Sequence, residues 1–142
     1  MTDSINMDAA MATEIGKGKF PGLIGVEILD FGDAWISGRL DVREAVMAPN
    51  GFLHAGAVIG LADTLCGYAS VRALPKGASG FTTIETKSNH LGTARDGYVV
   101  GRAEALHLGK TTQVWDATVK RADDDKTIAV FRCTQMVLWP KS

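Results

Sequence analysis

Hydrophobic and polar residues alternate along two stretches near the N-terminus, residues 25–33 and 34–42, and this period of two predicts a pair of strands. The second stretch has two unlike faces, one carrying Trp35, Ser37 and Arg39 and the other Ile36, Gly38 and Leu40. Gly32 and Asp33 provide a turn signal between the two stretches. We therefore expect a β-hairpin whose two faces meet different environments.

The pattern becomes helical after an irregular loop at residues 43–53. Apolar residues recur with the spacing i, i+3, i+4, i+7, i+8 and i+11, at Val58, Leu61, Ala62, Leu65, Cys66 and Ala69. Pro75 and Gly77 end this helix. Gly56, Gly60 and Gly67 each disfavour it by about 1 kcal/mol relative to alanine, so we expect another backbone to approach closely there. The pattern predicts a central, buried helix.

Four strand-like segments follow the helix, at residues 80–91, 98–108, 111–121 and 127–139. In the last three, small or apolar residues occupy alternate positions, as on the buried face of a sheet. A Gly-Lys turn at 109–110 and the acidic stretch 122–126 separate these three strands. Consecutive hairpin strands after one long helix predict an α+β fold, in which an antiparallel sheet wraps around the helix.

The chain has 142 residues, of which 46% are hydrophobic and 22% charged, as is typical of one globular domain. Residues 1–19 are polar and predict an N-terminal arm or a short helix, and residues 20–142 are expected to form the single domain. The N-terminus lacks the features of a secretory signal, and the longest apolar run is too short to cross a membrane. We therefore expect a cytoplasmic protein.

The formal net charge is −1, from 15 basic and 16 acidic residues. This balance favours neither a nucleic acid nor a membrane as a partner. The two cysteines, Cys66 and Cys133, lie in apolar segments and are expected to be buried free thiols. The histidines, at positions 54, 90 and 107, lack zinc-ligand spacing. The sequence therefore predicts no metal site and no cofactor.

A lone carboxylate, Asp63, lies among the apolar residues of the predicted helix. Burying an unpaired charge is strongly unfavourable. Asp63 therefore either points to solvent, pairs with an arginine, or takes part in chemistry. The sequence has no G-x-S-x-G nucleophile motif, and neither cysteine has a histidine partner by motif. A carboxylate mechanism is the one that these residues support.

The loop and the start of the helix, Asn50-Gly51-Phe52-Leu53-His54-Ala55-Gly56, are followed by Leu61-Ala62-Asp63-Thr64. This segment resembles the signature of hotdog-fold acyl-CoA thioesterases of the phenylacetic-acid-degradation type, which are related to the 4-hydroxybenzoyl-CoA thioesterases. Weaker matches lie at residues 81–85, 109–112 and 128–132, and the resemblance covers roughly residues 20–139. The nine-residue spacing from His54 to Asp63 is its most specific part.

The resemblance implies hydrolysis of a coenzyme A thioester in an active site between two subunits. Asp63 matches the catalytic carboxylate, which acts as general base or nucleophile. His54 and Asn50 match loop positions that line the thioester, and the backbone N–H of Ala55 matches the donor that polarises its carbonyl. Thr83 matches a residue that helps to position water and would come from the partner subunit. The family usually has glycine where this chain has Ala55, which affects substrate fit more than reaction type.

Four further residues are candidates for substrate binding: Gly56 at the helix start, Arg95 in one turn, and Lys110 and Thr111 in another. The two basic side chains could bind the phosphates of coenzyme A, although exposed turns often carry such charges. The helix-start, loop and strand positions also have ordinary structural explanations as a helix cap, a turn residue and a strand residue.

The resemblance also implies a homo-oligomer, a dimer or a tetramer built as a dimer of dimers, because the family pairs two sheets edge to edge. The expected substrate is an acyl-CoA with a small, medium-chain or aromatic acyl group. Two alternatives remain open: a hotdog hydratase or dehydratase, and a non-catalytic acyl-CoA-binding module.

Overall fold

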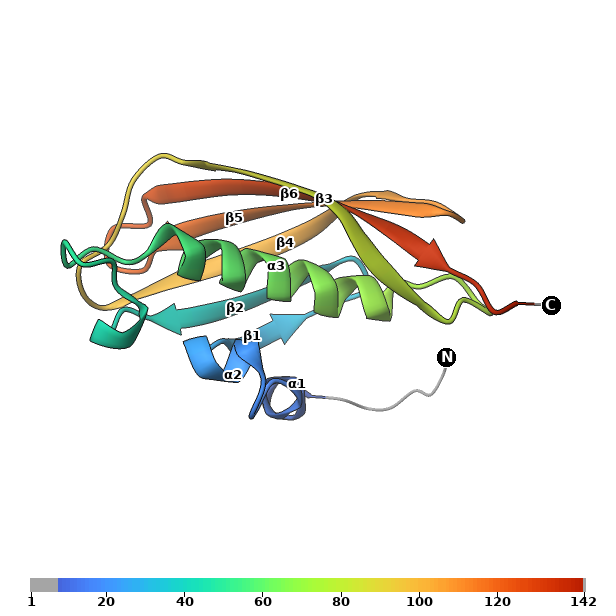
Figure 1. Ribbon diagram of the computed structural model, residues 1–142, viewed down its shortest axis with the longest axis horizontal. Coiled ribbons are helices and arrows are strands. Elements are labelled where there is room, and N and C mark those ends of the chain that lie inside the picture. The colour runs from blue at the N-terminus through green and yellow to red at the C-terminus, as the bar shows by residue number, and fades with distance from the viewer. Residues whose placement is uncertain (1–7, 142) are drawn as a thin grey trace.

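The computed structural model describes residues 8–141 and contains three α-helices, one short 3-10 helix and six strands within that range (Figure 1). In chain order these are α1 (Ala9–Ile15), α2 (Phe20–Ile24), β1 (Glu27–Phe31), β2 (Trp35–Asp41), η1 (Glu44–Val46), α3 (Ala55–Arg72), β3 (Gly80–His90), β4 (Tyr98–Leu108), β5 (Thr112–Arg121) and β6 (Thr127–Leu138). The predicted strands and the long helix are confirmed, with ends that differ by a few residues.

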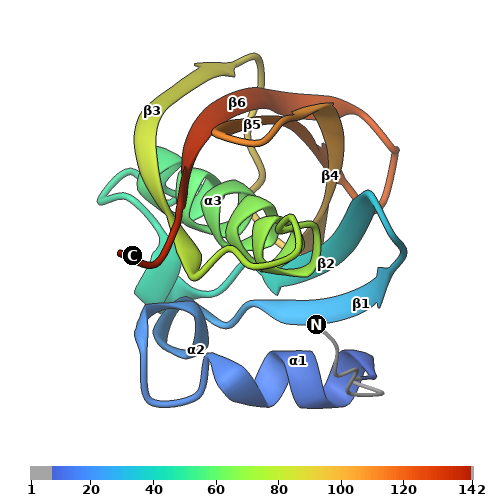
Figure 2. The ribbon, with the colours of Figure 1, turned by 90° about the vertical axis from the view of Figure 1, so that its right-hand side faces the viewer.

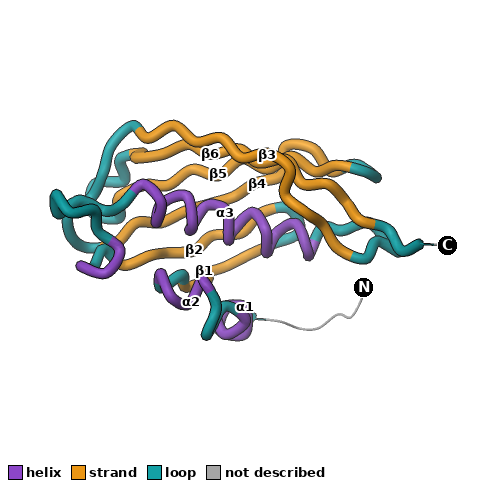
Figure 3. Tube along the Cα trace, viewed as in Figure 1, coloured by secondary structure: helices purple, strands orange, loops and turns teal. Residues whose placement is uncertain are grey.

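The six strands form one antiparallel sheet in the order β1-β2-β4-β5-β6-β3. Figure 2 looks along α3 and shows the sheet curling around the helix from β1 to β3, and Figure 3 shows the same strands beside the single long helix. Alternate residues of β2, β4, β5 and β6 are buried against α3. The architecture is the α+β hotdog fold that the sequence predicted.

The apolar stripe of α3 is buried, as its spacing predicted, and Leu61, Leu65 and Cys66 have no exposed surface. The glycines of α3, however, face side chains rather than another backbone. A Cβ atom on Gly60 would lie 2.8 Å from Cδ1 of Ile24 and 2.9 Å from Cε2 of Phe20. The prediction of a close backbone approach was therefore wrong, because the missing side chain makes room for α2.

The N-terminal segment provides two short helices. Within the segment predicted as an arm or a short helix, residues 9–15 form α1 with Asp8 as the N-cap, whereas residues 1–7 lie outside the described part of the chain. The helix α2 was not predicted, although Pro21 in its first turn and Gly25 in the left-handed conformation after it are ordinary boundary signals. Five residues are too few for a helical period to be visible in the sequence.

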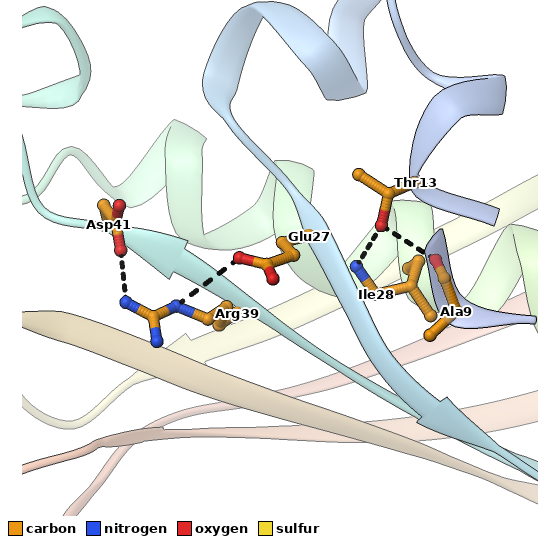
Figure 4. A network of polar contacts seen from close by, with 6 residues as sticks. All are labelled: Ala9, Thr13, Glu27, Ile28, Arg39 and Asp41. Carbon is orange, nitrogen blue, oxygen red and sulfur yellow. Dashed lines mark hydrogen bonds and ion pairs between the residues drawn. The ribbon is translucent and has the colours of Figure 1, made fainter. Parts of the chain in front are cut away.

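The two edges of the sheet differ. At β1, the helix α1 covers the edge, and Thr13 Oγ1 accepts a hydrogen bond of 2.9 Å from the backbone N–H of Ile28 (Figure 4). At the other edge, β3 has eleven residues, of which eight are exposed. A β-bulge interrupts its pairing with β6 between Thr83 and Glu85. The β3 edge is therefore long and open, whereas a helix blocks the β1 edge.

Both cysteines are free and buried, as predicted. No helix within residues 8–141 is long and apolar enough to cross a membrane.

Candidate active site

One side of α3 is left open by the sheet. Along the i, i+4 ridge of the helix, Ala55 and Val71 at the ends are exposed, and Ile59, Asp63 and Gly67 between them are partly buried. The sequence placed Ala55, Ile59 and Asp63 on one ridge, and none of the three is fully buried. Asp63 therefore lies in the middle of the open side, on the same face as the helix start.

The Asp63 carboxylate is partly buried but has no hydrogen-bond or ion-pair partner among residues 8–141. Burial by itself raises the pKa of Asp63 above the usual value of an aspartate. Its surroundings are apolar: Phe20 rests on Gly60, three residues before it, and Phe81 lies over Gly67, four residues after it. A carboxylate held this way is poorly solvated and basic, as general-base catalysis requires.

The start of α3 presents one free backbone donor. His54 is the N-cap, and its Nδ1 accepts a hydrogen bond of 2.7 Å from the backbone N–H of Gly56. The N–H groups of Ala57 and Val58 donate to the His54 carbonyl oxygen. Within the described residues, the N–H of Ala55 has no acceptor, and Ala55 is exposed. Of the two candidates at the helix start, Ala55 therefore offers a donor to a ligand, whereas the Gly56 N–H is already engaged.

The loop before α3 has an ordered backbone. The Asn50 Oδ1 atom accepts a hydrogen bond of 3.2 Å from the Phe52 N–H, and Gly51 has a φ of 87°, a value that suits glycine. The Leu53 N–H donates to the Ala94 carbonyl oxygen, which ties this loop to the loop before β4. In this structure Asn50 is a turn residue that shapes the entry to the helix.

Arg95 lies at the same end of the molecule as the helix start. Its guanidinium carbon is 5.0 Å from the centroid of the Phe52 ring, two residues before His54. The structure thus brings Arg95, from the loop before β4, to the loop that carries Asn50 and His54 and leads into α3 at Ala55. A cation at this position can meet an anionic part of a ligand bound at the helix start.

Lys110 and Thr111 lie at the opposite end of α3. They form the turn between β4 and β5, where the Trp139 indole donates to the Lys110 carbonyl oxygen. Gln113, directly after this turn, donates to the carbonyl oxygen of Ala73 at the end of α3. An 18-residue helix is about 27 Å long. Lys110 and Thr111 of one chain are therefore far from the Ala55 N–H of the same chain (Figure 1).

Thr83 is exposed on the open edge strand, next to the bulge of β3. Its cross-strand partner is Gln135, whose side chain is buried and donates to Ser70 Oγ. Because directly opposed residues project to the same face of a sheet, Thr83 projects toward the α3 side. Its position allows contact with the open face of its own helix or with a second molecule at the edge.

Two cavities of the single chain lie away from these residues. One, of about 610 Å³, is on the outer face of the sheet and includes Tyr98, Arg102 and Lys120, and another, of about 640 Å³, separates α1 from β1. Within residues 8–141, no group of three or more His, Cys, Asp and Glu side chains is placed to hold a metal ion. Neither of these two cavities is lined by Asp63 or Ala55.

One neighbour of Asp63 was missed by sequence reasoning. Phe20 was assigned to the start of the domain without a role, yet it packs on α3 only three positions from the carboxylate. Pro21 and Gly25 could have revealed the short helix that carries it, but nothing in the sequence indicates which face of α3 this helix contacts.

Comparison with known proteins adds three findings. Residues 50–128 match the family model described as the thioesterase superfamily. A 1,4-dihydroxy-2-naphthoyl-CoA hydrolase from Listeria monocytogenes is 34% identical over 78% of this chain and 89% of its own length. Among solved structures, a thioesterase from Pseudomonas aeruginosa superposes with a TM-score of 0.88 at 31% identity, covering 95% of this chain and 96% of that one.

A thioesterase from Haemophilus influenzae also has a TM-score of 0.88, at 28% identity, and covers 97% of this chain and 95% of that one. The two solved structures thus cover nearly the whole chain, and the family model includes the end of the loop before α3, the helix itself and Thr83.

Proposed function

We propose that Asp63 and the Ala55 N–H together carry out the reaction of this protein. The chain belongs to the thioesterase superfamily and is an acyl-CoA thioester hydrolase. The observation that supports this proposal is the unpaired, partly buried carboxylate on the same open helix face as a free backbone donor. A buried charge without a partner destabilises a fold, so its presence on this face points to a role in chemistry.

The Ala55 N–H is suited to bind the thioester carbonyl oxygen. It is the unpaired N–H group of the first turn of α3, where the helix dipole favours negative charge. Attack on the carbonyl carbon moves charge onto the oxygen, and a donor already oriented toward that position stabilises the transition state by roughly 2.7–4 kcal/mol. The methyl group of Ala55 leaves this donor intact.

The short reach of an aspartate favours a general base over a nucleophile. From Ala55 to Asp63 the helix rises about 12 Å. The leaning Asp63 side chain, the hydrogen bond at Ala55 and the carbonyl itself span only part of that distance, and the remainder fits one water molecule. Asp63 would take a proton from this water, the water oxygen would bond to the carbonyl carbon, and the coenzyme A sulfur would leave as a thiolate that is then protonated.

This assignment of Asp63 has a direct test. In a single turnover in ¹⁸O-labelled water, a general base sends the label into the acid product and never into the protein, whereas a nucleophilic Asp63 forms an anhydride that places label in the Asp63 carboxylate whenever water opens it at the Asp63 carbonyl carbon. Label found in a peptide that contains Asp63 would replace the general-base mechanism by the nucleophilic one.

A second copy of the chain is proposed to complete the site. The open β3 edge can pair with the same edge of another copy around a two-fold axis, and this pairing would run the two α3 helices antiparallel. Lys110 and Thr111 of the partner subunit would then reach the Ala55 end of the helix, and the partner's Thr83 could approach the open face. The arrangement accounts for the separation of these residues within one chain.

The acyl group is proposed to be aromatic. One relative is named for the hydrolysis of 1,4-dihydroxy-2-naphthoyl-CoA, whose acyl group is a fused aromatic ring system. The apolar surroundings of Asp63 suit such a group better than a charged one.

A panel of substrates tests the reaction class. Wild-type protein is mixed with benzoyl-, phenylacetyl- and hexanoyl-CoA, and the free thiol is measured with a chromogenic disulfide reagent. In parallel, an enoyl-CoA is followed by loss of its conjugated absorbance. Thiol release supports the thioesterase. Hydration without thiol release would show a hydratase, and tight binding without either would show a binding module.

A further inference from the structure

Two phenylalanines stand beside Asp63, one toward each end of α3, and each rests on a glycine of the helix. A Cβ atom on Gly60 would lie 2.9 Å from Cε2 of Phe20, and a Cβ atom on Gly67 would lie 3.5 Å from Cζ of Phe81. Positions three and four residues from Asp63 are its neighbours on the helix surface. The two rings therefore lie over helix positions adjacent to Asp63, one from α2 and one from β3.

Phe20 is more exposed than a side chain of the core. It is 55% exposed, whereas Ile24, on the same short helix and against the same glycine, is 7% exposed. Leu23, on the same helix, is 73% exposed. The helix α2 thus directs one apolar residue into the core and leaves two others uncovered, and the ring of Phe20 is next to the open face of α3.

The absence of a side chain at Gly60 permits this placement of the ring. Any Cβ atom at this position would come closer to both Phe20 and Ile24 than side chains normally approach. Alanine would favour the helix more than glycine does if it fitted. The glycine therefore keeps α2 against the helix and holds the ring one turn from Asp63.

We propose that Phe20 forms one wall of the acyl pocket and makes the enzyme prefer aromatic over short aliphatic acyl groups. An aromatic ring offers a substrate ring a large flat contact, with favourable offset or edge-to-face packing. An acetyl group is too small to use it. The inference rests on the proposed function, because the pocket exists only if the thioester lies between Ala55 and Asp63.

The test compares kcat/KM for benzoyl-CoA and acetyl-CoA in three variants. Phe20→Ala is expected to lower the ratio of benzoyl-CoA to acetyl-CoA activity by about five- to thirtyfold, through the lost ring contact. Phe20→Leu, which keeps an apolar side chain against Gly60, should lower it less. Met11→Ala is the matched control: Met11 is 47% exposed on α1, which packs on β1, and its loss should leave the ratio unchanged.

The outcomes separate this inference from the proposed function. An unchanged ratio in folded Phe20→Ala and Phe20→Leu, or an equal fall for both substrates, would overturn the role of Phe20 in the acyl pocket. An equal fall would assign the ring to the part that both substrates share. Absence of turnover in the wild type with every acyl-CoA would instead overturn the proposed function. Thermal unfolding of each variant confirms that the compared proteins are folded.

Discussion

At the residue scale, Asp63 combines an unfavourable position for stability with a favourable one for chemistry. It is partly buried, lies between two helix positions covered by Phe20 and Phe81, and has no polar partner within the described chain. A structural carboxylate would be paired or hydrogen-bonded. A structural role predicts that removing the Asp63 charge destabilises the protein, whereas a chemical role predicts that removing it stabilises the protein. The two roles can therefore be distinguished without a substrate.

We predict that Asp63→Asn has a higher free energy of unfolding than the wild type at pH 7. Burial raises the pKa of Asp63 in the folded protein, so the folded state binds its proton more tightly than the unfolded state does. The resulting stabilisation is present below the unfolded-state pKa and is lost as pH rises through the folded-state pKa. Asparagine remains neutral throughout.

The measurement is urea unfolding of both proteins at pH 7 and near pH 4. The gain of Asp63→Asn should be present at pH 7 and should shrink toward pH 4, where the wild-type carboxyl becomes protonated. A lower stability of the variant at pH 7 would mean that Asp63 makes a stabilising contact.

His54 caps α3 through Nδ1, which leaves its Nε2 as the protonated nitrogen of the neutral ring. We predict that His54→Ala lowers the free energy of unfolding by about 1 kcal/mol, whereas His54→Asn, whose side-chain oxygen can also accept from the helix, changes it by a few tenths. Denaturant unfolding measures both. Equal destabilisation by the two substitutions would refute the capping role.

The same pair of variants isolates the imidazole. Because His54→Asn keeps the helix start, a fall in its kcat/KM reports the missing Nε2–H group at the open end of α3. Full activity in His54→Asn would limit His54 to capping.

At the element scale, α3 carries glycines with different tolerance for a side chain. Gly67→Ala adds a methyl group at ordinary contact distance from Phe81, whereas Gly60→Ala places one too close to Phe20 and Ile24. We predict that Gly67→Ala raises the free energy of unfolding by up to about 1 kcal/mol, through helix propensity. The free energy of unfolding of Gly60→Ala should be lower than that of Gly67→Ala, because α2 must move to make room for the added methyl group.

Thermal and urea unfolding of the two alanine variants provide this comparison. The two substitutions share the same helix, the same added methyl group and the same gain in propensity, so their difference reports the packing of α2. Equal stabilisation by both would show that α2 does not rest on Gly60.

The long elements could be predicted from the sequence because their residues repeat with a clear period. The stripe that includes Leu61 and Leu65 identifies α3, and the alternation in β2, β4 and β5 identifies one buried face of the sheet. The short helix α2 has no visible period, and its contact with α3 joins residues 40 positions apart. Phe20 therefore became a neighbour of Asp63 only in the folded chain.

The candidate site was predictable to a similar degree. The alignment of Ala55 and Asp63 on one ridge of α3 follows from local helix geometry, and both are at least partly exposed there, with His54 as the N-cap before them. The separation of Lys110 from Ala55 could not be read from turns alone, because it depends on which end of α3 each hairpin reaches.

At the scale of the whole molecule, the difference between the two sheet edges predicts that two copies associate through the β3 edge and not through the β1 edge. The β1 edge is covered by α1, with Thr13 accepting from the Ile28 N–H, whereas β3 is open. We predict that Ile84→Lys, at a 53% exposed position of β3, weakens self-association and lowers activity together. A charge at a pairing edge opposes strand addition.

Sedimentation at micromolar concentration measures the effect. Leu29→Lys on β1, where the native side chain is 41% exposed, is the matched control and should assemble as the wild type does. A monomeric wild type would contradict the shared-site arrangement, as would an Ile84→Lys variant that is monomeric and fully active.

The central claim is that the partly buried carboxylate on the open face of α3 performs the hydrolysis, and the turnover of Asp63→Asn tests it most directly. Thiol release from the best acyl-CoA is measured at pH 7 for the wild type and for the variant, with unfolding curves showing that both are folded. Loss of a general base predicts a kcat/KM lower by roughly 10² to 10⁴-fold. Wild-type turnover by folded Asp63→Asn would contradict the claim.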